Sequence, residues 1–240
     1  MKMNELNELS LLRLKIFEES GDIRKGIKFA IKFKHYIVDD IRRNEALARL
    51  YMANNQTKKA IEHLEILVKY NSCNTEYYKQ ILIANGIDLS KPENSDQINE
   101  ILSKYEEVQP KSNSHIRLAL DLLPAGIEFK TKLIKYMRPM VIKGVPSLIN
   151  DIKNLYTDSA KAKIIEEILL SMCSSMETEM VLDPADEEEQ DPTSQLWIYY
   201  FLSQHHLNLA QVEEALVWIN KAIEHTPTVV ELYLQKGKIF

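Results

Sequence analysis

The chain of 240 residues is 45% hydrophobic and 27% charged, and it carries a formal net charge of −5. Six glycines, eight prolines and the abundance of Leu, Ile, Glu and Lys favour helices, and no alternating strand pattern is present, which excludes a β-sheet fold. Two isolated cysteines exclude a disulfide framework and a structural zinc site. The lack of an apolar run of about 18 residues excludes a membrane span. We therefore expect a cytoplasmic protein without a membrane partner.

Residues 1–110 carry the signature of tetratricopeptide repeats, in which pairs of antiparallel helices recur every 34 residues or so. Phe17 and Tyr51 are one such period apart, and so are Gly26 and Ala60. Asn55 falls at the turn between the two helices of the second copy, where asparagine tolerates a positive φ. We therefore predict tetratricopeptide-like repeats throughout this region.

A third copy begins at Thr75, but its turn is wider than in the first two copies. Gly86 and Pro92 separate its two helices, and the second helix is predicted from about residue 96 to residue 108. After Pro110 the 34-residue frame is lost. Residues 111–180 are therefore predicted to be helical but irregular.

Apolar side chains at helical spacing predict three helices in this irregular region. The first begins near Ile127 and is expected to end near Pro139, because proline disrupts a helix interior. The second covers residues 148–156. The third is capped by Thr157 or Asp158 and continues past residue 172.

An acidic segment follows these helices. No Lys or Arg occurs between Lys163 and Lys221, whereas the rest of the chain is mildly basic. The consecutive acids Glu187, Glu188 and Glu189 lack the spaced ligands and the glycine of a calcium loop. We predict that residues 177–194, with their acidic part at 181–194, form a solvated and mobile loop.

Residues 195–240 contain one complete repeat and the first helix of the next. Small residues at fixed repeat positions let two helix backbones approach, large ones fill the gaps, and a proline ends the second helix. The repeat positions singled out over the whole chain are Tyr51, Ala60, Tyr199, Ser203, Ala215, Ala222, Pro227 and Gly237, and Gly237 follows Ser203 by one period. Because the last copy stops after one helix, we expect a fragment of a longer array.

The fold class predicted is all-α, a tetratricopeptide-type solenoid of helical hairpins that coils into a right-handed superhelix with an irregular middle. The first helix of each pair forms the inner wall of such a superhelix, where partners dock. By repeat position the inner wall exposes Glu45, Arg49, Trp197, Tyr200 and Gln204, which we predict to bind a partner. For Trp197, packing between repeats remains an open alternative.

Residue patterns typical of catalysis or of cofactor binding are missing from the sequence. No two glycines are two residues apart, as a glycine-rich phosphate-binding loop would need. His205 and His206 are adjacent on a helix and point about 100° apart, so we do not expect them to chelate a metal together. Neither Cys73 nor Cys173 has an activating neighbour. We therefore expect no catalytic residue, no cofactor and no metal.

Two basic groups leave two interpretations open. The first group is Lys25, Lys28 and Lys32 on one helix face, and the second is Lys130, Lys132, Lys135, Arg138 and Lys143. Each is either an outer face kept solvated by charge or a surface for ribosomal RNA. No DNA partner is expected.

Several short motifs resemble the auxiliary subunit of the N-terminal acetyltransferase A complex, a pattern much narrower than the repeat signature. They include Lys143-Gly144-Val145-Pro146, Leu155-Tyr156, Ile164-Ile165-Glu166-Glu167, Leu196-Trp197, Gln204-His205, Ala222-Ile223-Glu224, Thr226-Pro227-Thr228 and Glu231-Leu232. The resemblance extends over nearly the whole chain.

This resemblance implies a non-catalytic scaffold, a central segment of a long superhelical subunit. Such a subunit binds and activates a small catalytic acetyltransferase and anchors it near the exit tunnel of the ribosome, where nascent chains are acetylated. In some family members inositol hexakisphosphate lies between the subunits, but no residue of this chain is assigned to it.

Two other function classes compete with the scaffold. A generic tetratricopeptide adaptor could grip the acidic C-terminal tails of chaperones, but it needs Lys and Asn on the inner wall, where Glu45 and Tyr200 stand. An enzyme in its own right is not expected, because no set of catalytic residues converges.

Overall fold

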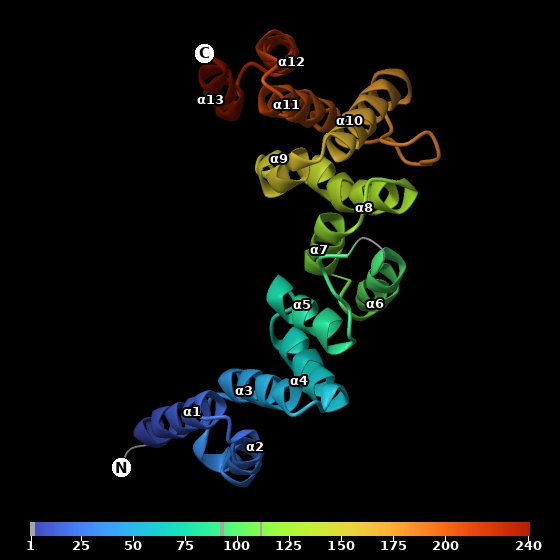
Figure 1. The fold of residues 1–240 in the computed structure, drawn as a ribbon. Coiled ribbons are helices and arrows are strands. Elements are labelled where there is room, and N and C mark those ends of the chain that lie inside the picture. The colour runs from blue at the N-terminus through green and yellow to red at the C-terminus, as the bar shows by residue number, and fades with distance from the viewer. Residues whose placement is uncertain (1–2, 92–93, 111) are drawn as a thin grey trace. The chain divides into compact units, whose positions relative to one another are not determined.

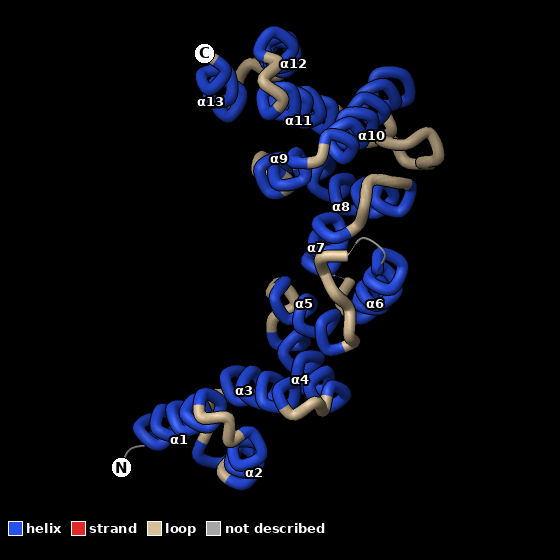
Figure 2. The backbone as a smooth tube through the Cα atoms, in the orientation of Figure 1, coloured by secondary structure: helices blue, strands red, loops and turns tan. Residues whose placement is uncertain are grey.

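The computed structural model describes residues 3–91, 94–110 and 112–240, and the predicted turn residue Pro92 lies outside this part. Within the described residues the chain is helical without a strand, as Figure 2 shows, which confirms the all-α prediction. None of the described helices is long and apolar enough to cross a bilayer. The chain forms two compact units, Met1–Leu122 and Leu123–Phe240. The predicted subdivision at residues 110, 180 and 194 and the right-handed superhelix stay predictions.

The N-terminal unit is a succession of helical hairpins, in which each helix packs mainly on its neighbours in the chain (Figure 1). Its helices are α1 (Met3–Glu19), α2 (Ile23–Lys32), α3 (Asp40–Ala53), α4 (Thr57–Tyr70), α5 (Thr75–Ala84), α6 (Ser95–Val108) and α7 (Ser114–Leu122), with a short 3-10 helix at Lys34–Tyr36. These bounds confirm the helix pairs predicted for the first three copies.

The repeat residues of the N-terminal unit fulfil their predicted roles. Asn55 has a φ of 56° at the turn between α3 and α4. A Cβ atom added to Gly26 would lie 3.1 Å from Cβ of Phe17 and 3.2 Å from the side chain of Leu50, so only a very small residue fits between α1, α2 and α3. Tyr51 and Ala60 are both buried in the same hydrophobic core.

The C-terminal unit combines an irregular helical layer with a regular repeat. Its helices are α8 (Ile127–Lys143), α9 (Leu148–Asp151), α10 (Ser159–Glu179), α11 (Thr193–Asn208), α12 (Val212–His225) and α13 (Val230–Ile239), with a 3-10 helix at Lys153–Thr157. Helix α11 packs against α8, α10 and α12, and α12 packs against α13. The core of this unit therefore forms around α11.

The helix end predicted at Pro139 is wrong. Helix α8 continues through Pro139 to Lys143 and ends at Gly144, which adopts the left-handed conformation with a φ of 60°. Proline removes one backbone donor, but Val141, two residues beyond it, is completely buried and keeps the last turn packed on the core.

The acidic segment is only partly the solvated loop that the sequence predicts. Val181 and Leu182 are buried, and the Asp186 carboxylate lies 2.6 Å from the Arg138 guanidinium. The loop is therefore held against the unit at both places, contrary to the prediction. Glu187–Glu189 are exposed, as predicted.

The last repeat has the small and large residues where the sequence predicts them. Tyr199 and Ser203 on α11 and Ala215 and Ala222 on α12 are buried, while Pro227 lies between α12 and α13. Gly237 differs, since a Cβ atom added there would meet nothing within 4 Å. The structure therefore gives no packing reason for glycine at this position.

The N-terminal cap of α10 offers a stability test. The Asp158 carboxylate accepts a hydrogen bond from the Ala160 amide at 2.8 Å, which satisfies one of the four free N–H groups at the helix start. We expect Asp158→Ala to lower the free energy of unfolding by about 1 kcal/mol. Asp158→Asn, which keeps an acceptor oxygen, should remain close to the parent protein in urea denaturation. Equal losses in both variants would contradict this role.

Candidate partner-binding grooves

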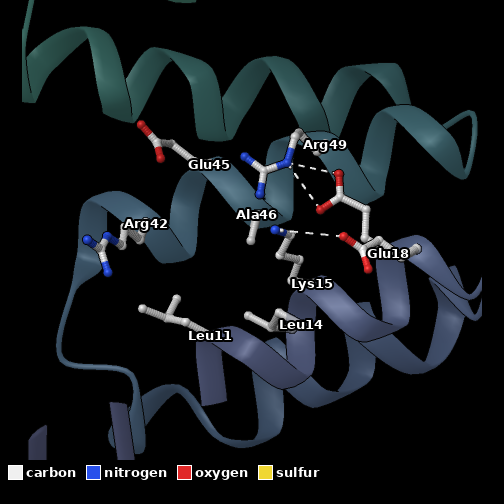
Figure 3. Close-up of a pocket in the computed structure, with 9 residues that line it drawn as sticks. Leu11, Leu14, Lys15, Glu18, Arg42, Glu45, Ala46 and Arg49 are labelled. Atoms are coloured by element: carbon white, nitrogen blue, oxygen red, sulfur yellow. Dashed lines mark hydrogen bonds and ion pairs between the residues drawn. The ribbon is translucent and has the colours of Figure 1, made fainter. Parts of the chain in front are cut away.

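The first candidate surface is a groove of about 650 Å³ between α1 and α3, which we call the α1–α3 groove (Figure 3). An apolar floor and a rim of both charge signs line it, formed by Leu11, Leu14, Lys15, Glu18, Glu19, Arg42, Glu45, Ala46 and Arg49. The predicted partner-binding residues Glu45 and Arg49 therefore share one groove.

Both of these side chains are held by neighbours. Nε of Arg49 donates to both carboxylate oxygens of Glu18, at 2.9 and 3.2 Å. The hydroxyl of Tyr77 donates to Glu45 at 2.8 Å, and burial, followed by this contact, raises the pKa of Tyr77 above its ordinary value. The charges of the groove are thus pre-positioned, which lowers the entropy cost of binding a partner there.

A second groove of about 530 Å³ lies in the C-terminal unit, and we call it the α11 groove. It is lined by Pro146, Ser147, Ile149, Asn150, Lys153, Tyr200, Gln204, Leu207, Asn208, Gln235 and Lys238. Nε2 of Gln204 donates to the Tyr200 hydroxyl at 3.1 Å, while Oε1 of Gln204 is buried without a hydrogen-bond partner. The groove thus holds a polar atom whose hydrogen-bonding capacity is unused.

Two aromatic predictions need correction. Tyr200, expected to be exposed, is only 5% exposed, because residues of α9 and α13 flank it in the groove. Trp197 does not line the groove. Its ring packs against Gly144 and stacks on Phe201 at a centroid distance of 6.3 Å, which favours the packing alternative.

The two basic groups differ in the structure. Lys25, Lys28 and Lys32 are all exposed on α2. In the second group Lys130 lies 3.0 Å from Glu167, Arg138 pairs with Asp186, and Lys132 is buried. Lys135 and Lys143 are exposed, so the second group is a mixture of paired, buried and exposed side chains, whereas all three lysines of the first group are exposed.

The two cysteines lie in different environments. Burial, reinforced by the Glu177 carboxylate, raises the pKa of the Cys173 thiol to about 12, so it stays protonated at neutral pH. Cys73 is an exposed, free thiol.

A cluster that the sequence analysis missed lies between α10 and α11. Glu166, His205 and His206 each place one potential ligand atom within 4.8 Å of the other two. The two histidines thus lie closer to one another, and to an acid, than their positions on the helix indicated, and the expectation that they do not chelate a metal together stays untested. Their Cα–Cβ bonds diverge along the helix, but the imidazole rings extend far enough to lie 5.2 Å apart, and Glu166 comes from a helix distant in the sequence.

Comparison with known proteins adds to this description. A family model described as "N-terminal acetyltransferase A, auxiliary subunit" matches residues 4–240. A relative from Arabidopsis thaliana, "N-terminal acetyltransferase A complex auxiliary subunit NAA15", is 31% identical over 98% of this chain and 26% of its own length. The Homo sapiens "N-alpha-acetyltransferase 16, NatA auxiliary subunit" is also 31% identical, over 98% of this chain and 27% of its own length. The chain thus spans about a quarter of the length of these relatives.

A solved structure has a similar fold. A chain from "Structure of Naa15/Naa10 bound to HypK-THB" superposes with a TM-score of 0.85 and 23% sequence identity, covering all of this chain and 35% of that one. This likeness concerns the fold.

Proposed function

The chain belongs to the auxiliary-subunit family of N-terminal acetyltransferase A, and from this membership we propose that it is a non-catalytic scaffold segment that binds and activates the catalytic subunit of such a complex. The family match over residues 4–240 is the observation that carries the proposal. A helical-hairpin architecture without a nucleophile or a phosphate-binding loop in its sequence supports a scaffolding role.

The catalytic partner is proposed to contact the two grooves. In the α1–α3 groove Glu45 and Arg49 offer charges of opposite sign above an apolar floor, which suits a helix or loop with an apolar side and a mixed charge pattern. In the α11 groove Gln204 and Tyr200 lie among the lining residues, and Nε2 of Gln204 donates to the Tyr200 hydroxyl. Trp197 helps to position Tyr200, because the two rings pack edge to face with their centroids 5.5 Å apart.

The proposal extends to the place of action, which we infer to be the cytoplasm near the ribosomal exit tunnel. The exposed lysines of α2 suit a phosphate-rich surface such as ribosomal RNA. A generic adaptor for acidic peptide tails is the weaker alternative, since the α1–α3 groove holds three acids as well as three bases.

Coexpression tests the scaffold directly. Tagged chain should copurify with the catalytic acetyltransferase of the same source and accelerate acetylation of peptides that begin with Ser or Ala, whereas the chain alone should show no turnover. The double charge reversal Glu45→Lys, Arg49→Glu should weaken copurification at least tenfold. The matched control Lys25→Glu, on exposed α2, should leave it unchanged. Neither copurification nor activation by the parent chain would refute the proposal, and turnover by the chain alone would refute its non-catalytic nature.

A further inference from the structure

The most unusual polar feature of the C-terminal unit is the buried ring of His205 on α11. Its side chain is completely buried, and its Nε2 atom has no hydrogen-bond partner. The nearest acidic oxygen is Oε2 of Glu166 on α10, at 3.9 Å, which is too long for a hydrogen bond. Buried polar atoms of folded proteins are nearly always satisfied, so this nitrogen points to a missing partner.

In both His205 and His206, the Nδ1 atom already has a hydrogen-bond partner. Nδ1 of His205 lies 2.8 Å from the Tyr156 hydroxyl, and Nδ1 of His206 lies 2.7 Å from Oε1 of Gln211. An amide oxygen only accepts, so Nδ1 of His206 carries the hydrogen and the lone pair of the ring lies on Nε2. Hydrogen bonds of this kind fix the ring orientation of histidines that bind metals.

Access from solvent and the types of ligand also suit a cation. The Glu166 side chain is 34% exposed, which leaves a path from solvent to the space between Glu166, His205 and His206. Two imidazoles and one carboxylate favour a borderline divalent metal over magnesium or calcium, which prefer oxygen ligands.

We propose that Glu166, His205 and His206 bind one divalent transition-metal ion, with zinc as the best chemical fit. Zinc takes imidazole nitrogen and carboxylate oxygen at about 2.0–2.2 Å, so tetrahedral ligands lie about 3.4 Å apart. Oε2 of Glu166 and Nε2 of His205 are 3.9 Å apart, and the three ligand atoms all lie within 4.8 Å of one another. Small side-chain movements would therefore bring them to the tetrahedral separation. A water molecule would complete the fourth position. The site joins α10 to α11, so the ion would act as a cross-link within one unit.

The test uses the whole chain in a Cys73→Ser background, because the exposed thiol could bind zinc by itself. After removal of metal by a chelator and exchange into chelator-free buffer, zinc chloride is titrated by calorimetry, and cobalt chloride is titrated with optical detection. We expect one ion per chain and cobalt d–d bands without a thiolate charge-transfer band, since the ligands are nitrogen and oxygen.

Variants identify the ligands. Glu166→Gln should weaken zinc binding at least tenfold, whereas the matched control Glu167→Gln, adjacent on α10 and paired with Lys130, should bind as the parent does. His206→Gln should also weaken binding, and circular dichroism should show that each variant remains helical. The proposal is overturned if the parent shows no saturable binding, or if Glu166→Gln and His206→Gln bind zinc as tightly as the parent.

Discussion

Replacing Gly144 with alanine is expected to lower the free energy of unfolding of the C-terminal unit by about 2–5 kcal/mol. Two effects add up at this position. The φ of 60° costs a residue with a Cβ atom about 1–2 kcal/mol. The new Cβ atom would also clash with the indole ring of Trp197, and overpacking of this kind typically costs about 1–3 kcal/mol.

Gly21→Ala is the matched control for this substitution. Gly21 also has a positive φ, 76°, but an added Cβ atom would meet nothing within 4 Å, so only the backbone effect remains. Both tryptophans, Trp197 and Trp218, belong to the C-terminal unit, so tryptophan fluorescence in urea reports its unfolding, while circular dichroism follows the control. Equal losses in the two variants would show that the contact with Trp197 costs nothing.

Truncation of Phe201 to alanine should cost about 3–5 kcal/mol, the usual range for a buried aromatic residue. Phe201 lies on α11, is completely buried, stacks against Trp197 and meets Tyr200 edge to face. The loss is a large fraction of the total stability of a typical domain, about 5–15 kcal/mol. Denaturant midpoints followed by tryptophan fluorescence measure it.

Val217→Ala provides the comparison for Phe201→Ala. Val217 lies on α12 of the same unit and is 56% exposed, so its truncation should change the stability by less than about 1 kcal/mol. A loss below about 1 kcal/mol for Phe201→Ala would contradict the central place of α11 in the core of this unit.

The repeat architecture could be predicted from the sequence because close helix packing restricts the residues at fixed spacings. Ser203, Ala215 and Ala222 are buried where two helices approach, and Asn55 adopts the positive φ that its turn needs. The cap of α10 could be narrowed to Thr157 or Asp158, since capping depends on neighbouring residues alone, and the structure shows that Asp158 provides it.

The features that escaped prediction depend on partners distant in the sequence. Pro139 would end an isolated helix, but the buried Val141 keeps α8 intact. Asp186 is one of several acids in its segment, and only the folded structure shows that Arg138 lies beside it.

The candidate site was predicted only in part for the same reason. Repeat position predicted that Glu45 and Arg49 lie on one first helix, and the structure places both in the lining of the α1–α3 groove, while their contact with a partner stays a prediction. It could not show that α9 and α13 enclose Tyr200. Nor could it show that Glu166 approaches His205, because no local spacing connects α10 to α11.

In the N-terminal unit, the helices that pack on one another are close in the sequence, and this affects how the unit folds. Helix α1 packs on α2 and α3, α3 packs on α4, and α4 packs on α5, so the helix contacts join segments that are close in the sequence. Contacts of this kind close short loops, lose little chain entropy and favour rapid folding. We therefore expect this unit to assemble hairpin by hairpin during its own translation, before the residues that follow have been synthesised.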